Sequence, residues 1–396
     1  MTAAPALPEG DGADRIRWLS IGAAIASISV VGMALGLGMP LLSVVLESRG
    51  HSATMIGLNT AFAGIASIIA APFAAPLASR FGVAATMLVM SLAASVAFLG
   101  FYAADSFWMW FPLRLVLHFA ITVLFVLSEF WITATAPPAK RGLVLGVYAT
   151  VLSLGFAIGP WLFSQLGSAG ILPFLVAAGM ALLAAPPVAA AWRESPDIRA
   201  SRPSARFSSY IFLVPTATAA VFVFGAVETG GFALFPIYGS RLGYTEAEAA
   251  LLLTAIGLGN VLLQIPLGLL SDRMRDRRHL LLICAAIGLL GMLALPYIAA
   301  SWYGTAALLF VWGGVVAGLY TVGLAHLGSR LTGRDLASAN AAFVLCYGIG
   351  MLAGPQAIGL GMDLFGTHGF AHVLAVFFVA YLVVGASRLT RAGGLS

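Results

Sequence analysis

The chain has 396 residues, of which 61% are hydrophobic and only 9% are charged, and its formal net charge is +5. Soluble domains carry about 25% charged residues, so this composition excludes a soluble globular protein and indicates a membrane protein with several spans. A transmembrane β-barrel is also disfavoured, because barrel strands alternate between apolar and polar residues and the apolar runs of this chain are unbroken and of helical length.

Twelve apolar runs long enough to cross a bilayer as helices follow one another along the chain. They lie at residues 16–46, 53–78, 83–102, 106–134, 140–167, 171–192, 210–238, 246–271, 279–300, 303–330, 335–363 and 370–389. We therefore predict an all-α membrane protein with twelve transmembrane helices. Residues 1–15 contain Glu9, Asp11 and Asp14 and precede a run too long for a signal peptide, so we expect them to remain as an uncleaved tail.

The longest polar stretch, RESPDIRASRPSARFSS at residues 193–209, divides the twelve runs into six and six. Its proline, serine and arginine content is typical of a linker. We expect one six-helix bundle over residues 16–192 and a second over 210–389, followed by a short tail at 390–396.

The distribution of lysine and arginine predicts the orientation of these helices. If the N-terminus lies inside the cell, 17 of the 20 lysine and arginine residues fall in cytoplasmic segments, as the positive-inside rule requires. We therefore expect a multi-pass protein of the plasma (bacterial inner) membrane, with the linker and both termini in the cytoplasm. The net charge of +5 then reflects topology and does not indicate binding to nucleic acid.

An internal repeat relates the two halves at a constant offset of 193 residues. Four pairs of identical residues preserve their order along the chain: Gly50 and Gly243, Gly64 and Gly257, Arg141 and Arg334, and Gly155 and Gly348. Two six-helix repeats suggest a transporter whose substrate path lies between the halves.

Two loops and one helix carry family signatures. The sequence GLLSDRMRDRR at 268–278 resembles the G-x-L-x-D-R-x-x-R-R loop of the major facilitator superfamily, and APLASRFGVAA at 75–85 resembles a degraded copy in which Ser79 replaces the aspartate. The segment RLVLHFA at 114–120 is similar to the R-x-x-x-G segment of the family's fourth helix, with His118 in place of glycine. These signatures imply the fold of that superfamily, with two pseudo-symmetric six-helix halves and transport by alternating access.

A glycine-proline pattern in the fifth and eleventh helices extends the resemblance. It is similar to the motif of drug/proton antiporters, although Phe163 and Ser164 replace its final glycine pair, and it consists of Gly146, Gly155, Gly159, Pro160, Gly350, Gly354 and Pro355. Such residues permit close helix contact and local bending. Two interpretations remain open: a hinge that moves between the halves, or ordinary tight packing. The segments VETGGFALFPIYG, LLQIPLGLLSD, VLSEFW and GLYTVGLAH look like the YcaD-like branch of the family.

The resemblance also implies a cytoplasmic gate. Asp272 and Arg273 are expected to contact Arg141 and the free N–H groups at the start of the fifth helix and so to hold the inner side closed. Alternatively, the loop is charged only because it lies inside the cell. Since Ser79 cannot form an ion pair, the symmetric latch near Arg334 should be weaker.

Five ionisable side chains lie clearly within the predicted spans: Arg114, His118, Glu129, Glu228 and His326. At 1.5 Å per residue, Arg114 lies ~12 Å and Glu228 ~15 Å below the outer surface. Helices one, four, seven and ten line the central cavity of the resembled fold. We therefore expect Arg114 and Glu228 to face each other, either as a pair or with water or substrate between them.

Glu228 is the strongest candidate for the group that takes up and releases a coupling proton, and a permanent structural pair with Arg114 is the alternative. His118 lies one helical turn from Arg114 and is expected to share its network, unless it makes a simple polar contact between helices. Glu129 lies ~22 Å further toward the cytoplasm. We expect it to pair with Arg80 or Arg141 at the inner gate, with direct proton binding as the alternative.

Further polar and aromatic side chains are candidates for lining the substrate path: Asn59, Tyr148, Phe232, Phe235, Asn260, Gln264, Tyr320 and Tyr347. A mostly apolar cavity with one arginine and one glutamate suits amphipathic organic solutes. The chain shows no metal-ligand spacing, no nucleotide-binding loop and no nucleophile-base pairing. We therefore expect no cofactor, no metal site and no enzymatic activity.

The sequence favours a proton-coupled secondary transporter that exports small amphipathic compounds, acting as a monomer in the lipid bilayer. One alternative is an importer, either a proton symporter or a facilitator, for an organic anion bound by Arg114. A second alternative, a membrane enzyme or assembly factor on the same scaffold, would need a catalytic cluster that the sequence does not contain.

Overall fold

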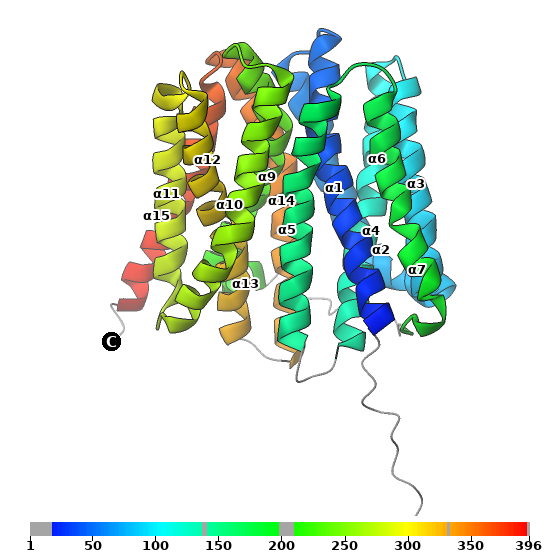
Figure 1. The fold of residues 1–396 in the computed structure, drawn as a ribbon. Helices are drawn as coiled ribbons and strands as arrows, with labels where there is room; N and C mark the ends of the chain where they lie inside the picture. Colours follow the sequence, from blue (N-terminus) through cyan, green and yellow to red (C-terminus); the bar gives the residue numbers. More distant parts are fainter. Residues whose placement is uncertain (1–17, 137–140, 198–209, 331–332, 394–396) are drawn as a thin grey trace, which may run out of the picture.

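The computed structural model describes residues 18–136, 141–197, 210–330 and 333–393. Within these ranges the chain forms helices and no strand, which confirms the all-α prediction. The described residues contain twelve helical spans that are long and apolar enough to cross a membrane. They stand side by side in a bundle in which α1 begins and α15 ends on the same side (Figure 1). We call this the terminal side, and the opposite one the far side.

The first half of the described chain contains seven α-helices and two short 3₁₀ turns. These are α1 (Trp18–Ser48), α2 (Ala53–Phe81), α3 (Val83–Ala103), η1 (Phe107–Met109), α4 (Trp110–Thr135), α5 (Arg141–Leu166), α6 (Leu172–Leu183), α7 (Ala185–Ala190) and η3 (Trp192–Glu194).

The second half contains eight α-helices within the described ranges. These are α8 (Tyr210–Leu213), α9 (Pro215–Arg241), α10 (Glu246–Arg273), α11 (Arg277–Ile298), α12 (Trp302–Val316), α13 (Gly318–Arg330), α14 (Gly333–Leu364) and α15 (Gly369–Gly393).

Three predicted spans are interrupted, each next to residues that disfavour a continuous helix. The sixth span divides into α6 and α7 at Ala184, just before two prolines, and the seventh begins with the short α8 and a break at Val214, before Pro215. The tenth span divides into α12 and α13 at Ala317, next to Gly318. The last break lies deep in the bundle, where it shapes a pocket.

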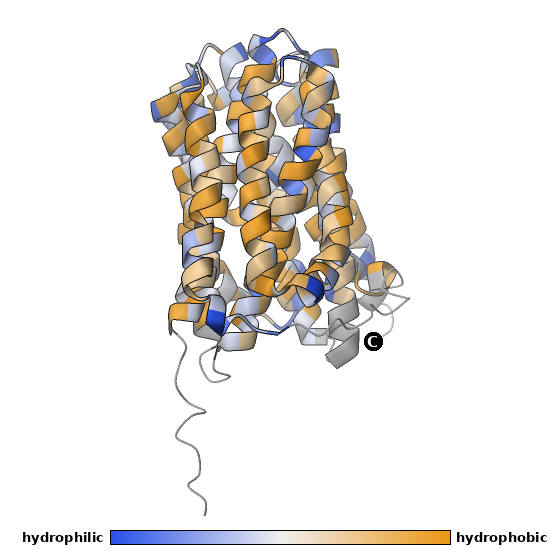
Figure 2. Ribbon diagram, turned by 90° about the vertical axis from the view of Figure 1, so that its right-hand side faces the viewer, coloured by the Kyte–Doolittle hydropathy of each residue, from blue (hydrophilic) through white to orange (hydrophobic). Residues whose placement is uncertain are grey.

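The surface of the bundle is apolar in its middle part. Figure 2 shows hydrophobic residues along the middle of the outer helices and hydrophilic residues gathered toward both ends. On α10, for example, Leu262, Ile265 and Leu269 are each about 60% exposed. Large apolar side chains at such positions are stable only against lipid, so the fold supports a membrane location.

The 193-residue repeat has a structural cause at the far side. Gly50 and Gly243 occupy the turns after α1 and α9 with positive φ angles of 86° and 90°, a conformation that glycine adopts without strain. Ser52 and Thr245, also related by the repeat, then cap α2 and α10 by accepting a hydrogen bond from a main-chain N–H of the first turn. The matching residues therefore build the same turn and helix start in each half.

The two halves meet along two helix pairs. α2 packs along α14 and α5 packs along α10, while α1 and α9 also touch. The glycines of the repeat lie at these crossings: a Cβ on Gly64 would lie 2.6 Å from the Gly348 carbonyl oxygen, and one on Gly257 would lie 2.7 Å from the Cα of Ala157. Small residues thus bring the helices of the two halves into backbone contact.

Candidate functional site

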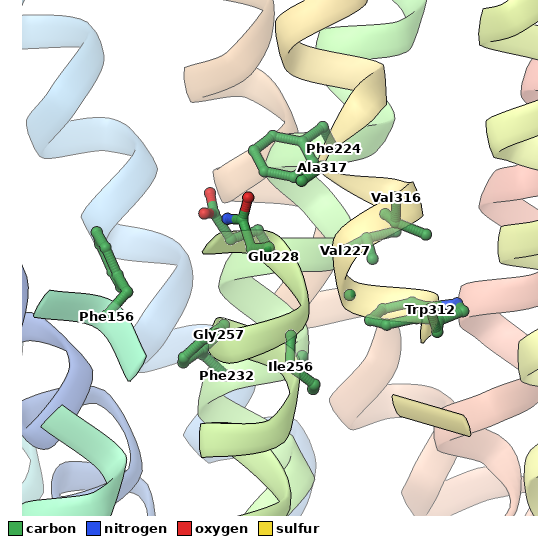
Figure 3. A pocket seen from close by; sticks show the side chains of 13 residues that line it. Phe156, Phe224, Val227, Glu228, Phe232, Ile256, Gly257, Trp312, Val316 and Ala317 are labelled. Carbon is green, nitrogen blue, oxygen red and sulfur yellow. The ribbon is translucent and has the colours of Figure 1, made fainter. Parts of the chain in front are cut away.

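Glu228 faces a pocket inside the second half of the bundle (Figure 3). The pocket lies between α9, α10 and α12, and α5 of the first half contributes one wall. Its lining consists of Phe156, Phe224, Val227, Glu228, Gly231, Phe232, Ile256, Gly257, Asn260, Trp312, Gly313, Val316 and Ala317. Nearly all of these residues are apolar or aromatic, so the Glu228 carboxylate and the Asn260 amide are the principal polar features.

Local sequence explains why there is space beside Glu228. Gly231 lies almost one helical turn further along α9, and a Cβ there would meet nothing within 4 Å. On the opposite wall, α12 ends at Val316 and the chain turns at Ala317 before α13 begins. A glycine on one wall and an interrupted helix on the other leave the carboxylate facing open volume.

The Glu228 carboxylate is held by one strong hydrogen bond. Its Oε2 accepts from the hydroxyl of Tyr347 on α14 at 2.6 Å, the length expected for a bond to a charged acceptor. The Tyr347 ring is itself fixed between Phe224, at 6.3 Å between centroids, and Tyr320, at 6.1 Å. Oε1 takes part in no hydrogen bond with any described residue, so one oxygen remains available to the pocket.

Glu129 forms no ion pair with Arg80, and the side chain of Arg141, its other expected partner, lies outside the described residues, so its role at the gate remains a prediction. No described residue forms an ion pair with it, and the side chains that interact with it electrostatically are Tyr148 and Tyr320. Tyr320 interacts with Glu228 in the same way. Tyr320 is thus close enough to the carboxylates of both halves to interact electrostatically with each.

Arg114 and Glu228 form no ion pair, so the direct pair, one of the predicted alternatives, is not found in the structure. The Arg114 Nε and Nη2 both donate to the Oδ1 of Asn59 on α2, at 3.1 and 3.0 Å, and the guanidinium lies over the Phe101 ring. Arg114 is 1% exposed and does not line the pocket. Each of the two side chains is therefore hydrogen-bonded to a neutral residue of its own half.

His118 belongs to the same buried group as Arg114. Its Nδ1 lies 3.2 Å from the Arg114 carbonyl oxygen one turn earlier, so the two residues share contacts as expected. Its Nε2 and the Nδ2 of Asn59 are buried without a hydrogen-bond partner among the described residues. His326, which is also buried, is engaged in interactions of its own near the end of α13.

The predicted cytoplasmic gate is only partly visible. Asp272 pairs with Arg277 of its own loop at 3.1 Å and with no described residue of the other half. Arg80 lies over the ring of its neighbour Phe81 and pairs with no described carboxylate. The side chains of Arg141 and Arg334 lie outside the described parts of the structure, so the latch between Asp272, Arg273 and Arg141 remains a prediction.

The motif glycines of α5 pack within their own half. A Cβ on Gly155 would lie 2.6 Å from the Ser29 carbonyl oxygen of α1, and one on Gly159 would lie 2.6 Å from the Cα of Gly36. A Cβ on Gly146 would meet nothing within 4 Å. The contacts favour tight packing of α5 on α1 over direct contact between the halves at these positions.

The corresponding residues of α14 pack on α9 and on α2. A Cβ on Gly350 would lie 2.9 Å from the Ala226 main-chain nitrogen, and Gly354 packs against the same residue. Pro355 contacts the other half, since its carbonyl lies directly against Gly57 of α2. Thus Gly350 and Gly354 pack α14 on its own half, and Pro355 contacts the opposite half.

The other predicted lining residues have different locations. Phe232 and Asn260 line the pocket, and Tyr148 and Tyr320 lie near the two carboxylates. Gln264 instead accepts from Ser153 of α5 at 3.5 Å, between the halves. The prediction for Phe235 is wrong, because that ring is 1% exposed and packs against Tyr238 and Phe370.

Several pocket residues could not be identified from the sequence. Phe156, Phe224, Ile256 and Trp312 resemble any other apolar residue of a span, and only the packing of four helices brings them together. The Trp312 Nε1 donates to the Gly288 carbonyl at 3.0 Å, so its ring is fixed in the wall.

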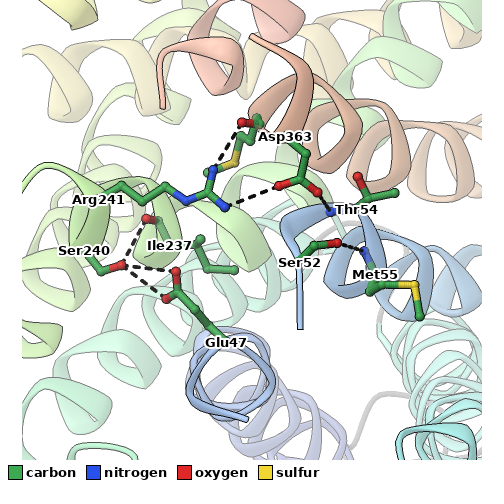
Figure 4. A network of polar contacts seen from close by, with 9 residues as sticks. Glu47, Ser52, Thr54, Met55, Ile237, Ser240, Arg241 and Asp363 are labelled. Atoms are coloured by element: carbon green, nitrogen blue, oxygen red, sulfur yellow. Dashed lines mark hydrogen bonds and ion pairs between the residues drawn. The ribbon is translucent and has the colours of Figure 1, made fainter. Parts of the chain in front are cut away.

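A polar cluster joins the halves on the far side (Figure 4). Asp363 at the end of α14 accepts from the Thr54 main-chain N–H of α2 at 2.8 Å and pairs with Arg241 of α9 at 3.4 Å. At the other crossing, Glu246 of α10 accepts from the N–H and the hydroxyl of Ser168, at 3.0 and 2.8 Å. An acidic residue thus ties a helix end of one half to the other half at both crossings.

Glu47 and Ser240 complete this far-side cluster. The Ser240 hydroxyl lies 3.2 and 3.3 Å from the two Glu47 carboxylate oxygens. Apart from the weak contact between Ser153 and Gln264, the hydrogen bonds between halves in the described chain all lie on this side. The sequence analysis missed the cluster, since acidic residues at helix ends look like ordinary surface residues.

Comparison with known proteins identifies the family. The family model of the Major Facilitator Superfamily matches residues 24–247 and 217–393. The chain belongs to the Major Facilitator Superfamily. It is 27% identical over 348 residues to the uncharacterized MFS-type transporter YfkF of Bacillus subtilis (strain 168), a match that covers 85% of this chain and 87% of that protein. It is 21% identical over 364 residues to the MFS-type transporter YcaD of Salmonella newport (strain SL254), over 91% and 93% of the two chains.

Solved transporter structures have the same fold as this superfamily member. The nucleoside transporter NupG superposes with a TM-score of 0.78 at 12% identity, over 93% of this chain and 99% of that chain. A bacterial homologue of the human lysosomal transporter Spinster, in an inward-facing and occupied conformation, has a TM-score of 0.70 at 16% identity, over 95% and 96% of the two chains. The protein is therefore a transporter and not an enzyme, and the resemblance to the YcaD-like branch is confirmed.

Proposed function

We propose that this superfamily transporter is a proton-coupled secondary transporter that exports small amphipathic organic compounds, with Glu228 as the proton-binding group. The observation that carries the proposal is the position of Glu228, whose Oε2 is held by Tyr347 while the pocket lies beside it. A carboxylate at bilayer depth is costly, and such residues commonly mark ion or proton pathways. The largely apolar walls, with four aromatic rings, fit an amphipathic solute.

Proton binding and substrate binding are linked because they use the same pocket. Protonated Glu228 is neutral and stable among apolar walls, whereas the ionised form requires the Tyr347 hydroxyl and a polar or charged ligand. A substrate that favours the ionised form therefore releases the proton. Glu129 and Tyr320 supply a second carboxylate and a hydroxyl close by, so we propose that they belong to the path by which the proton leaves.

We propose that the terminal side is cytoplasmic and that the bundles at 16–192 and 210–389 move as units. The positive-inside rule supports this orientation. The far-side hydrogen bonds between the halves then close the outer end of the path, and their rupture accompanies opening to the outside. We further propose a monomer in the plasma (bacterial inner) membrane, with both termini in the cytoplasm.

The alternative of an importer for an organic anion bound by Arg114 has less support. In this conformation Arg114 is fully buried, its guanidinium is occupied by Asn59, and it does not line the pocket. An anion would meet the carboxylate of Glu228 in the pocket.

Flux measurements in proteoliposomes test the proposal. The purified protein is reconstituted, a library of amphipathic compounds is added, and accumulation is recorded with the lumen acidic, with the outside acidic, and without a gradient. For an exporter oriented with its cytoplasmic side outward, we expect accumulation only with an acidic lumen. Glu228→Gln should abolish gradient-driven accumulation, whereas Asp105→Asn, which alters an exposed acid on the far side, should not. Full proton-driven accumulation by Glu228→Gln would end the proton-carrier hypothesis.

A further inference from the structure

We propose that the pocket beside Glu228 binds an organic ammonium ion that carries N–H groups, and that it discriminates against quaternary ammonium ions and carboxylates. This inference rests on the proposed function, since it names the substrate class of the same site.

Two polar atoms of the pocket residues are hydrogen-bond acceptors that lack a donor. Glu228 Oε1 accepts no hydrogen bond from a described residue, and the Asn260 Oδ1 is buried and has no partner in the described chain. A buried acceptor without a donor carries a desolvation cost of about 1–3 kcal/mol. Both residues line the same pocket, on the neighbouring helices α9 and α10. A ligand with two N–H donors would satisfy both oxygens.

Donors from the protein do not fill this role. The Tyr347 hydroxyl is committed to Glu228 Oε2, and the Trp312 Nε1 donates to a main-chain carbonyl. Among the described residues, no lysine, arginine or histidine lines the pocket. The donor that completes the site therefore comes from the ligand, and a positively charged donor bonds to a carboxylate about twice as strongly as a neutral one.

The walls suit the apolar part of such a ligand and stabilise its charge. Phe156, Phe224 and Phe232 surround Glu228 together with Trp312 (Figure 3). Aromatic faces attract a cation within about 6 Å of the ring, and they repel an anion for the same reason. Glu129, which interacts with Tyr320 next to the site, adds further negative potential when ionised.

The requirement for N–H groups separates this site from a simple cation cage. A quaternary ammonium ion would keep the attraction to the rings and to the carboxylate, but it would leave the Asn260 Oδ1 without a donor. The amide oxygen thus gives a preference among cations that charge and aromatic contacts alone do not provide.

Equilibrium binding to the full-length protein in detergent tests the proposal without a proton gradient. The probes share one tail: 4-phenylbutylamine, (4-phenylbutyl)trimethylammonium and 4-phenylbutanoate. Isothermal titration calorimetry at neutral pH, with the heats for empty micelles subtracted, should give the tightest binding for the amine. We expect the quaternary ion to bind at least about tenfold more weakly than the amine, which is the effect of losing a hydrogen bond that involves a charged group. We expect no measurable binding of the carboxylate.

Two variants assign the effect to its residues. Asn260→Leu should weaken amine binding about tenfold and leave the quaternary ion unchanged, so the amine preference disappears. Asn340→Leu makes the same change at an exposed position of α14 outside the pocket and should preserve the preference. Glu228→Gln should weaken the binding of both the amine and the quaternary ion.

The series on the unaltered protein decides the question even if a variant fails to fold. Equal affinities for the amine and the quaternary ion, or tighter binding of the carboxylate, would overturn the proposal. Amine binding without gradient-driven flux would contradict the proposed function while leaving the ammonium site intact. Flux of a compound that lacks any N–H donor, together with absent amine binding, would contradict the ammonium site while leaving the proposed function intact.

Discussion

Glu47 and Ser240 are equivalent positions of the two repeats, 193 residues apart, and they are hydrogen-bonded to each other. Equivalent positions of two pseudo-symmetric halves meet only near the axis that relates them. The contact therefore marks where the axis leaves the bundle on the far side, at the convergence of α1 and α9. A rocking motion of the halves about the pocket must separate these two residues first.

Glu47→Ala should shift the protein toward conformations open on the far side. The substitution removes a hydrogen bond to a charged acceptor, which contributes about 1–2 kcal/mol, or roughly a tenfold change in the ratio of closed to open forms. Distances between spin labels at the far ends of α1 and α9 check this. Asp105→Ala removes an exposed acid on the same side that makes no hydrogen bond or ion pair with a described residue, and should leave the distances unchanged. A distance distribution for Glu47→Ala that matches the unaltered protein would contradict the assignment.

Asp363→Ala should loosen the crossing of α2 and α14. Asp363 accepts from the first-turn N–H of Thr54 at 2.8 Å and also pairs with Arg241, and a carboxylate at a helix N-terminus is favoured by the helix dipole. We expect the amides at the start of α2 to exchange hydrogen about tenfold faster, which hydrogen-exchange mass spectrometry measures. The start of α10, whose capping box does not involve Asp363, serves as the internal control. Unchanged exchange at α2 combined with faster exchange at α10 would refute the local contact.

Tyr347→Phe should slow transport without loss of folding. Only the hydroxyl is removed, so the ring contacts with Phe224 and Tyr320 remain, while Glu228 Oε2 loses its donor. The ionised carboxylate then loses about 1.5–3 kcal/mol of stabilisation. We expect gradient-driven flux to fall about tenfold or more, with an unchanged melting temperature. Flux at the level of the unaltered protein would show that the bond to Tyr347 is not needed for proton release.

The sequence predicted the helix number, the two halves and the buried acid, but not the partner of that acid. Composition and run length are sufficient for the helices, and the positions at offset 193 mark real turns and crossings. Depth arithmetic set Arg114 and Glu228 at the same level. It did not fix the direction of either side chain around its helix, and Asn59 and Tyr347 on adjacent helices bind them instead.

The same limit explains the other differences. Glu129 was expected to pair with a cation at the gate because of its distance along α4, but among the described residues it interacts electrostatically with Tyr148 and Tyr320 and forms no ion pair. Phe235 was expected in the path because of its neighbours in sequence, but it packs against Phe370 in the core and does not line the pocket. Rotational position depends on tertiary packing, which a sequence without pronounced amphipathic periodicity does not specify.

The glycines of α5 provide a matched pair of substitutions. Gly155→Ala would place a Cβ 2.6 Å from the Ser29 carbonyl, so α1 and α5 must move apart, at a cost of about 1–3 kcal/mol. Gly146→Ala meets open space and replaces a poor helix former, so it should be neutral or stabilising by up to about 1 kcal/mol. Thermal unfolding in detergent should therefore rank Gly146→Ala above Gly155→Ala. The opposite order would refute tight packing at Gly155.

Asp276, which lies between α10 and α11, permits a prediction about pH. Its carboxylate accepts from the Arg278 guanidinium at 2.6–3.0 Å and from the Arg278 main-chain N–H at 3.0 Å, and these bonds hold the pKa of Asp276 at about 2, below its ordinary value. A lowered pKa stabilises the folded state above the unfolded pKa of about 4, and this stabilisation is lost only as the pH falls toward 2. Asp276→Asn keeps the helix cap but removes the ion pair, so it should lower the stability by about 1 kcal/mol. Because the carboxylate stays ionised throughout, the difference in melting temperature from the unaltered protein should be the same at pH 5 and pH 8. A difference that disappears at pH 5 would contradict the lowered pKa.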